Sequence, residues 1–81
     1  MRAPYMQTWE PYAQQLQHLR LAQGWSQQYL GLHAGVTRSA VCLYEQGGRA
    51  PSLPVLFALL RALEVTPGEF FNLNPESPHG Q

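Results

Sequence analysis

Residues 26–47 read SQQYLGLHAGVTRSAVCLYEQG, and this stretch decides the fold. Two short helices joined by a tight turn need three things: a small residue packed between them, a glycine that accepts positive φ at the corner, and a cap for the second helix. Ala34, Gly35, Val36 and Thr37 supply these features in order. The stretch therefore predicts two helices held at a fixed angle, with these four residues between them.

Capping residues set the bounds of both helices. Ser26 is expected to cap the first, over 27–34, and Thr37 the second, over 38–46, which Gly47 ends. The side chains expected to face inward are Leu30, Ala34, Val41 and Tyr44. The opposite side of 38–46 then carries Arg38, Ser39, Cys42 and Leu43.

One further helix is predicted before this unit. Thr8 is expected to cap it, with Pro11 in its opening turn, Gly24 at its end and Trp25 as an apolar plug behind the glycine. Its expected inner face is Tyr12, Leu16, Leu19 and Gln23.

Two more helices are predicted after the flexible linker at 47–51. Ser52 is expected to cap a helix over 53–63, and the capping box at 66–69 opens a short helix through Leu73. The apolar stripe expected on the longer one is Leu56, Phe57, Leu60 and Leu63. With no alternating strand pattern, the sequence predicts an all-α fold of five helices.

Length and composition indicate one small domain, because 81 residues with 44% apolar content suffice for a single core. We expect an N-terminal tail over 1–7, a folded domain over 8–73 and a disordered polar tail over 74–81. A single cysteine excludes an internal disulfide and fits a reducing cytoplasm. The absence of a bilayer-length apolar run and of a signal-peptide pattern predicts a cytoplasmic protein with no membrane partner.

The outer side of helix 38–46 predicts contact with double-stranded DNA, because such a convex helix fits the major groove. Arg38 has the donors for a bidentate contact to guanine, and Ser39 suits a base edge or a phosphate. Leu43 suits a thymine methyl group, unless the helix is tilted so that Leu43 joins the core. Gln27 at a helix start and Arg49 on the linker are placed to contact phosphates, whereas isolated side chains of these types are usually only solvated.

Net charge counts against DNA binding, because the chain has five basic and five acidic residues. The positions of the charged residues along the sequence weaken this objection. Between residues 14 and 52 three arginines stand against one glutamate, and Glu64, Glu69 and Glu76 lie after this stretch, alongside Arg61. We therefore expect a modestly positive face and a weaker salt dependence than that of a strongly basic repressor.

Several spaced motifs resemble the Cro/CI-type (xenobiotic-response-element) helix-turn-helix regulators over Leu19–Phe70. The motifs are LR-x-x-x-G-W-S-Q, A-G-V-T-R-S-x-V-x-x-Y-E-x-G, R-x-P-S-L and LEVTP. The resemblance implies a compact, lambda-repressor-like domain that binds operator DNA as a symmetric dimer. The ending LEVTPGEFFNL is also similar to controller proteins of restriction-modification systems, although phage-type repressors and antitoxins look alike at this level.

The resemblance also implies roles for individual residues. It makes Gln27 a phosphate contact, places Arg38, Ser39 and Leu43 where the family reads bases, and places Ala40 and Arg49 where it contacts the backbone. Arg20 and Glu45 match a structural ion pair that joins the first helix to the end of the third. The full predicted DNA-binding set is Gln27, Thr37, Arg38, Ser39, Ala40, Cys42, Leu43 and Arg49. Many relatives carry polar or basic residues at 40, 43 and 46, so fewer phosphate contacts are expected here.

The short last helix predicts a homodimer. Two turns cannot bury Phe70, Phe71 and Leu73 in the chain's own core, so one phenylalanine is expected inward. The other, with Leu73 and Val65, would form a self-complementary patch. The alternative is a monomer in which both rings cover the core.

The sequence contains no pattern typical of metal binding, catalysis or cofactor binding. His18, His33, His79 and Cys42 lack the spacing of a zinc site, no catalytic carboxylate pair or phosphate-binding loop is present, and no cofactor is expected. We therefore do not expect an enzyme. A protein-interaction module or antitoxin with weak DNA binding is the alternative function, and a toxin or RNA polymerase remains open as a further partner.

Overall fold

Five helices and no strand make up residues 4–72, the part of the chain that the computed structural model describes. Their bounds are α1 Pro4–Ala22, α2 Gln27–Ala34, α3 Arg38–Gln46, α4 Leu53–Leu63 and α5 Pro67–Asn72. The all-α, five-helix prediction is confirmed. Leu73 and the tail predicted over 74–81 lie outside the described residues.

The start of α1 differs from the prediction. The helix begins at Pro4, so Thr8 lies inside it and does not cap it, and residues 4–7 are not a tail. Proline suits the first position of a helix because its fixed φ is already helical and its missing N–H would have no partner there. Pro11, expected in the opening turn, instead lies within the helix, which continues past it to Ala22.

The caps predicted for the other four helices are present. The side-chain oxygens of Ser26, Thr37 and Ser52 accept hydrogen bonds from the backbone N–H groups three residues further on. At the start of α5, Thr66 and Glu69 form a reciprocal capping box, with side chain to backbone distances of 3.0 and 3.1 Å. These local hydrogen bonds satisfy the backbone N–H groups of the first helical turn, which have no acceptor within the helix.

The turn between α2 and α3 depends on Gly31, a glycine to which no role was predicted from the sequence. Gly35 ends α2 with φ of 78°, as predicted. The close approach, however, occurs at Gly31, where a Cβ atom would lie 2.6 Å from the carbonyl oxygen of Val36. Ala34, assigned this role from the sequence, is only half-buried. The small residue is therefore one helical turn earlier than predicted.

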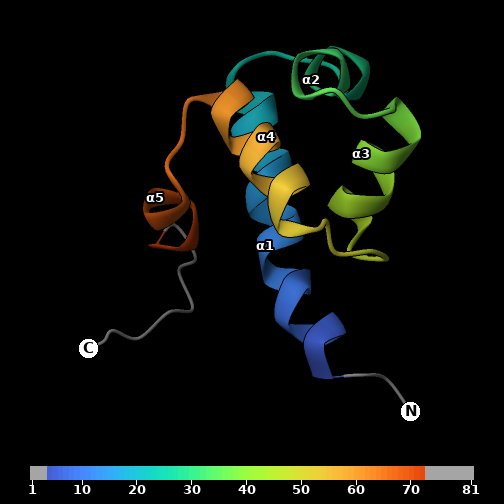
Figure 1. The fold of residues 1–81 in the computed structure, drawn as a ribbon, viewed down its shortest axis with the longest axis vertical. Helices are drawn as coiled ribbons and strands as arrows, with labels where there is room; N and C mark the ends of the chain where they lie inside the picture. Colours follow the sequence, from blue (N-terminus) through green and yellow to red (C-terminus); the bar gives the residue numbers. More distant parts are fainter. Residues whose placement is uncertain (1–3, 73–81) are drawn as a thin grey trace.

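The core lies where α1, α2, α3 and α4 meet, with α3 and α5 on opposite sides of the α1 and α4 helices (Figure 1). The buried apolar residues are Trp9, Ala13, Leu16, Leu30, Val41, Tyr44, Leu56, Leu59, Leu60, Leu63 and Phe70. One assignment in α4 was wrong: Phe57 is 43% exposed and Leu59 is buried in its place. The buried stripe of α4 is thus rotated away from Phe57, whose ring borders a surface hollow.

Candidate nucleic-acid interface

The outer side of α3 carries most of the residues predicted to meet DNA. Thr37, Arg38 and Ser39 are exposed at its start, and Leu43 is 40% exposed one turn later. Ala40 and Cys42 are half-buried. The Cys42 Sγ accepts a hydrogen bond of 3.3 Å from the Gln46 side chain, also on this helix. Leu43 therefore does not join the core.

The inner side of α3 is fixed by apolar contacts and by one long-range hydrogen bond. Val41 and Tyr44 are buried, as predicted. The Trp9 Nε1 donates a hydrogen bond of 2.9 Å to the backbone oxygen of Tyr44. The same oxygen also accepts the backbone N–H of Gly47 at 3.2 Å, so the indole takes its second lone pair. Sequence reasoning missed Trp9, because its partner is 35 residues away and its helix begins earlier than expected.

A buried ion pair joins the end of α1 to the end of α3. The Arg20 Nε and Nη2 atoms donate to the two carboxylate oxygens of Glu45 at 2.7 and 2.9 Å. The remaining nitrogen, Nη1, donates to the backbone oxygen of Trp25. The side chains of the pair are only 8% and 2% exposed. Such bidentate geometry fixes distance and angle together, so it orients α3 relative to α1.

Gln27 also belongs to this network. It is half-buried at the first position of α2, and its Nε2 donates a hydrogen bond of 3.0 Å to the Glu45 carboxylate. The sequence predicted Gln27 as a phosphate contact and did not predict its bond to Glu45. Because Gln27 and Glu45 are 18 residues apart, no local pattern indicates this contact.

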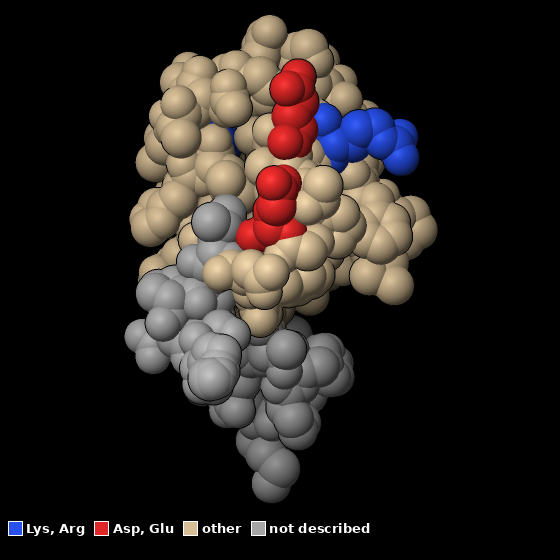
Figure 2. All heavy atoms as spheres, turned by 90° about the vertical axis from the view of Figure 1, so that its left-hand side faces the viewer, with Lys and Arg blue, Asp and Glu red and all other residues tan. Residues whose placement is uncertain are grey.

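Charge is distributed unevenly over the described residues. Arg38 and Arg49 are exposed on and beside α3, while Glu45 of the same helix is neutralised by Arg20. Glu10 of α1 approaches Gly47 at the end of α3, so this region carries one acidic residue that a count along the sequence did not include. Figure 2 shows the side on which α5 lies, where acidic atoms form a line with basic atoms beside it.

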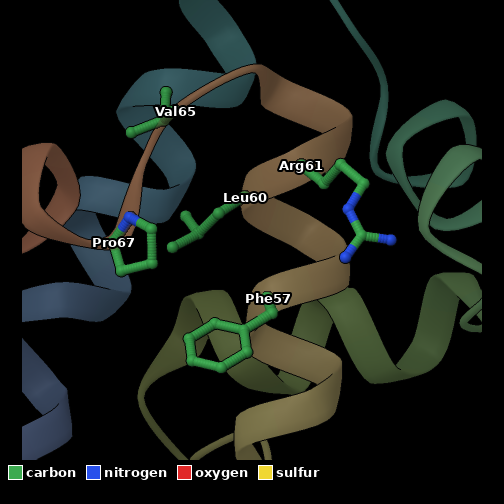
Figure 3. Close-up of a pocket in the computed structure, with 5 residues that line it drawn as sticks. All are labelled: Phe57, Leu60, Arg61, Val65 and Pro67. Carbon is green, nitrogen blue, oxygen red and sulfur yellow. The ribbon is translucent and has the colours of Figure 1, made fainter.

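A second surface lies between α4 and α5. A hollow of about 320 Å³ is lined by Phe57, Leu60, Arg61, Val65 and Pro67. Phe57, Leu60 and Pro67 converge on it, while the guanidinium of Arg61 points away (Figure 3).

The aromatic residues of α5 divide as the sequence predicted. Phe70 is fully buried, whereas Phe71 is 39% exposed and meets the Tyr12 ring edge-on at 4.9 Å. Val65 is half-buried at the hollow. Leu73, also predicted to belong to the patch, is outside the described residues.

Residues 4–72 offer no site for a metal ion and no helix that could span a membrane. That part of the chain contains no group of three or more His, Cys, Asp or Glu side chains able to hold a metal ion. None of its helices has the length and apolar character needed to cross a bilayer.

With this geometry in view, comparison with known proteins identifies the family. A helix-turn-helix family model matches residues 16–70, more than half of the chain. The chain belongs to the helix-turn-helix family. This agrees with the arrangement of α2 and α3 around Gly35, and it confirms the resemblance to Cro/CI-type regulators.

A solved structure extends this helix-turn-helix assignment. The restriction-modification controller protein C.AhdI from Aeromonas hydrophila is 38% identical in sequence and superposes with a TM-score of 0.76. The match covers 79% of this chain and 97% of the controller protein. No curated protein matches the chain. Family and structural likeness together make this helix-turn-helix protein a DNA-binding regulator, similar to restriction-modification controllers.

Proposed function

We propose that this regulator binds an inverted-repeat operator as a homodimer, with α3 in the major groove. The observation that carries the proposal is the contrast between the two sides of α3. Arg38 and Ser39 are exposed on its outer side, while the acidic group of the helix, Glu45, is buried against Arg20. An approaching phosphate backbone thus meets cationic and polar groups on α3 and no free carboxylate of that helix.

Base reading is assigned to three side chains of α3. Arg38 donates two parallel hydrogen bonds to the N7 and O6 atoms of a guanine, which is the commonest specific contact in the major groove. Ser39 meets the neighbouring base edge. Leu43, 40% exposed in the free protein, packs against a thymine methyl group and loses water there. Cys42 borders the same groove.

Backbone contacts are assigned to residues around these base readers. Arg49 lies exposed on the linker after α3 and reaches a phosphate there. Thr37 and Ala40 approach the backbone at the start of α3. Gln27 uses one amide hydrogen for Glu45, and an amide nitrogen has a second hydrogen to donate to a phosphate. These contacts position the protein without reading sequence.

Dimerisation is assigned to the α4 and α5 surface. Phe71, Val65 and the hollow beside Phe57 provide apolar area that a monomer leaves in water, and Leu73 is proposed to extend the same patch. Phe70, part of the patch predicted from the sequence, supports it from within the core. A two-fold axis through this patch presents two copies of α3 to half-sites about 10 bp, or about 34 Å, apart.

The likeness to a restriction-modification controller supports a proposal about which genes this regulator controls. We propose that the chain regulates restriction-modification genes, including its own, in the cytoplasm. It acts by binding DNA and catalyses no reaction. RNA polymerase is the protein partner that such a role involves.

Gel-shift titration with DNA from upstream of its own gene tests the proposal. The protein is expected to bind an inverted repeat with a submicromolar Kd at low salt. Arg38→Ala should cost about 1–3 kcal/mol of binding and relax the preference at one base position. Arg49→Ala should weaken all sequences alike and reduce the salt slope by about one.

Two results would contradict the proposal. If Arg38→Ala binds every sequence as the parent does, α3 does not read bases through this residue. If the parent binds no inverted repeat at low salt, the chain instead acts as a protein-interaction module or an antitoxin held by a toxin partner.

A further inference from the structure

The Glu45 carboxylate receives hydrogen bonds from two different helices. Its Oε2 accepts from the Arg20 Nε at 2.7 Å. Its Oε1 accepts from the Arg20 Nη2 at 2.9 Å and from the Gln27 Nε2 at 3.0 Å. Arg20 belongs to α1, Gln27 is the first residue of α2, and Glu45 lies in the last turn of α3. One buried carboxylate therefore links three helices.

The link between Gln27 and Glu45 acts at the far end of α3 from the turn. The start of α3 is fixed by the close approach at Gly31 and by the Thr37 cap. Nine residues rise about 13 Å along a helix, so the end of α3 needs contacts of its own to hold its direction. Two side chains from other helices supply direct hydrogen bonds to Glu45 there. Because the carboxylate side chain is 2% exposed, water does not replace a lost donor readily.

Gln27 is also at the DNA-facing start of α2 in the proposed complex. Ser26 caps this helix and uses its hydroxyl for the Tyr29 N–H. Within residues 4–72 the Gln27 amide nitrogen makes one hydrogen bond, to Glu45, so its second hydrogen is available to a phosphate. The same amide group can thus contact the DNA backbone and the base-reading helix at once.

We propose that Gln27 is a positioning residue for base reading: through Glu45 it sets the direction of α3, and it couples the phosphate contact at α2 to the bases that α3 reads. This inference rests on the proposed function. It differs from a simple phosphate contact, because a contact to the backbone alone carries no sequence information.

A double-mutant cycle measures this coupling. Gln27→Met keeps the length of the side chain and removes the donor, and Glu45→Gln removes the charge of the acceptor. Kd is measured for the operator and for the same DNA with one base pair changed under α3. Gln27→Met is expected to reduce the preference for the operator about fivefold, and this effect should be smaller when Glu45→Gln is already present, because an amide oxygen accepts a weaker hydrogen bond than a carboxylate does.

Two variants sharpen the test. Gln28→Met is the matched control, because Gln28 is the exposed neighbour in α2 and should leave the operator preference unchanged. Gln27→Lys supplies a donor to both the carboxylate and the phosphate. It should retain the preference and steepen the salt dependence by about one charge. Far-ultraviolet circular dichroism confirms that each variant is folded.

The outcomes separate the inference from the function on which it rests. If Gln27→Met weakens operator and altered DNA equally, Gln27 is only a phosphate contact, and the inference is overturned while operator binding stands. This comparison with Gln28→Met remains decisive even if Glu45→Gln unfolds the protein. If the parent itself shows no preference for the operator, both the proposed function and the inference are overturned.

Discussion

The unit formed by α2 and α3, here called the polar region, and the segment formed by α4 and α5, here called the apolar region, expose different kinds of side chain. The outer side of α3 in the first is mainly polar while its charged group is buried: Glu45 is buried against Arg20, and Arg38 and Ser39 face water beside the partly exposed Leu43. The second buries apolar groups and still exposes apolar ones: Phe70 is buried, while Phe57 and Phe71 remain about two-fifths exposed. A polar outer face suits hydrated phosphates and base edges, whereas an apolar one gains by meeting another protein surface.

The two regions also differ in how their geometry is fixed. The direction of α3 depends on hydrogen bonds whose angles are specific, from Trp9 and Arg20. The position of α5 depends on contacts between the Phe70 ring and the rings of Trp9 and Tyr12, which tolerate small shifts. Base reading needs the first kind of precision, because a bidentate contact fails when the helix is displaced. Burial of an apolar patch has no such directional requirement.

Breaking the buried pair should have the largest effect on the polar region. Arg20→Ala leaves the Glu45 carboxylate buried without its main partner, and the free energy of unfolding should fall by about 3–5 kcal/mol. Urea denaturation followed by circular dichroism measures this. Arg38→Ala is the control, because Arg38 is exposed and its loss should change stability by less than about 0.5 kcal/mol. Equal stability losses for the two variants would show that the pair does not hold α3.

The apolar region is tested by its two phenylalanines. Phe70→Ala removes a fully buried ring and should lower the free energy of unfolding by about 3–5 kcal/mol. Phe71→Ala removes an exposed ring and should leave a folded monomer. Sedimentation equilibrium and thermal unfolding separate the two effects, and Phe57→Ala should behave like Phe71→Ala. If all three variants remain folded dimers, the copies meet on another surface.

A smaller effect is expected at the turn of the polar region. In Gly31→Ala the new Cβ would lie 2.6 Å from the Val36 carbonyl oxygen, so backbone must move. Overpacking of this kind costs about 1–3 kcal/mol, and the better helix propensity of alanine returns about 1 kcal/mol or less. Thermal unfolding should therefore show a net loss. Gly68→Ala is the matched control, because its Cβ meets nothing within 4 Å. A gain in stability for Gly31→Ala would show that the turn has room for a side chain.

The smallest effect concerns the end of α4. Glu64 ends this helix with φ of 61°, the one non-glycine residue with positive φ among residues 4–72. Glu64→Gly should raise the free energy of unfolding by about 0.5–1 kcal/mol, since glycine adopts this conformation without a Cβ clash. Glu64→Ala removes the same charge and keeps the Cβ, so it should bring no such gain in thermal unfolding. Equal gains for both would assign the effect to charge and not to the backbone.

Local patterns predicted the elements of the polar region well. The bounds of α2 and α3, the caps at Ser26 and Thr37, and the glycine at 35 all follow from residues within one helical turn of each other. The capping box of α5 and the inward position of one phenylalanine followed in the same way. Hydrogen bonds between residues close in sequence need particular residue types at fixed spacings, and such patterns can be recognised in one sequence.

Contacts between distant residues were not predictable by such reasoning. Trp9 meets Tyr44 and Gln27 meets Glu45 only because the helices pack, so neither contact has a pattern in the sequence. The start of α1 was misplaced because Thr8 before Pro11 matches a helix start as well as Pro4 does. Helix α4 is apolar on more than one side, so the sequence alone does not show which side faces the core. In the structure Leu59 is buried and Phe57 is exposed.

The indole of Trp9 gives this protein a built-in optical reporter. Its N–H bonds to the last turn of α3 and its ring is 6% exposed, whereas Trp25 is half-buried and stacks on His33. The two fluorophores therefore differ in environment, and a Trp25→Phe variant would isolate the emission of the one that touches α3. Because the indole bonds to α3, we expect a change in the direction of this helix on DNA binding to shift the wavelength of Trp9 emission, which is measured in solution without a label.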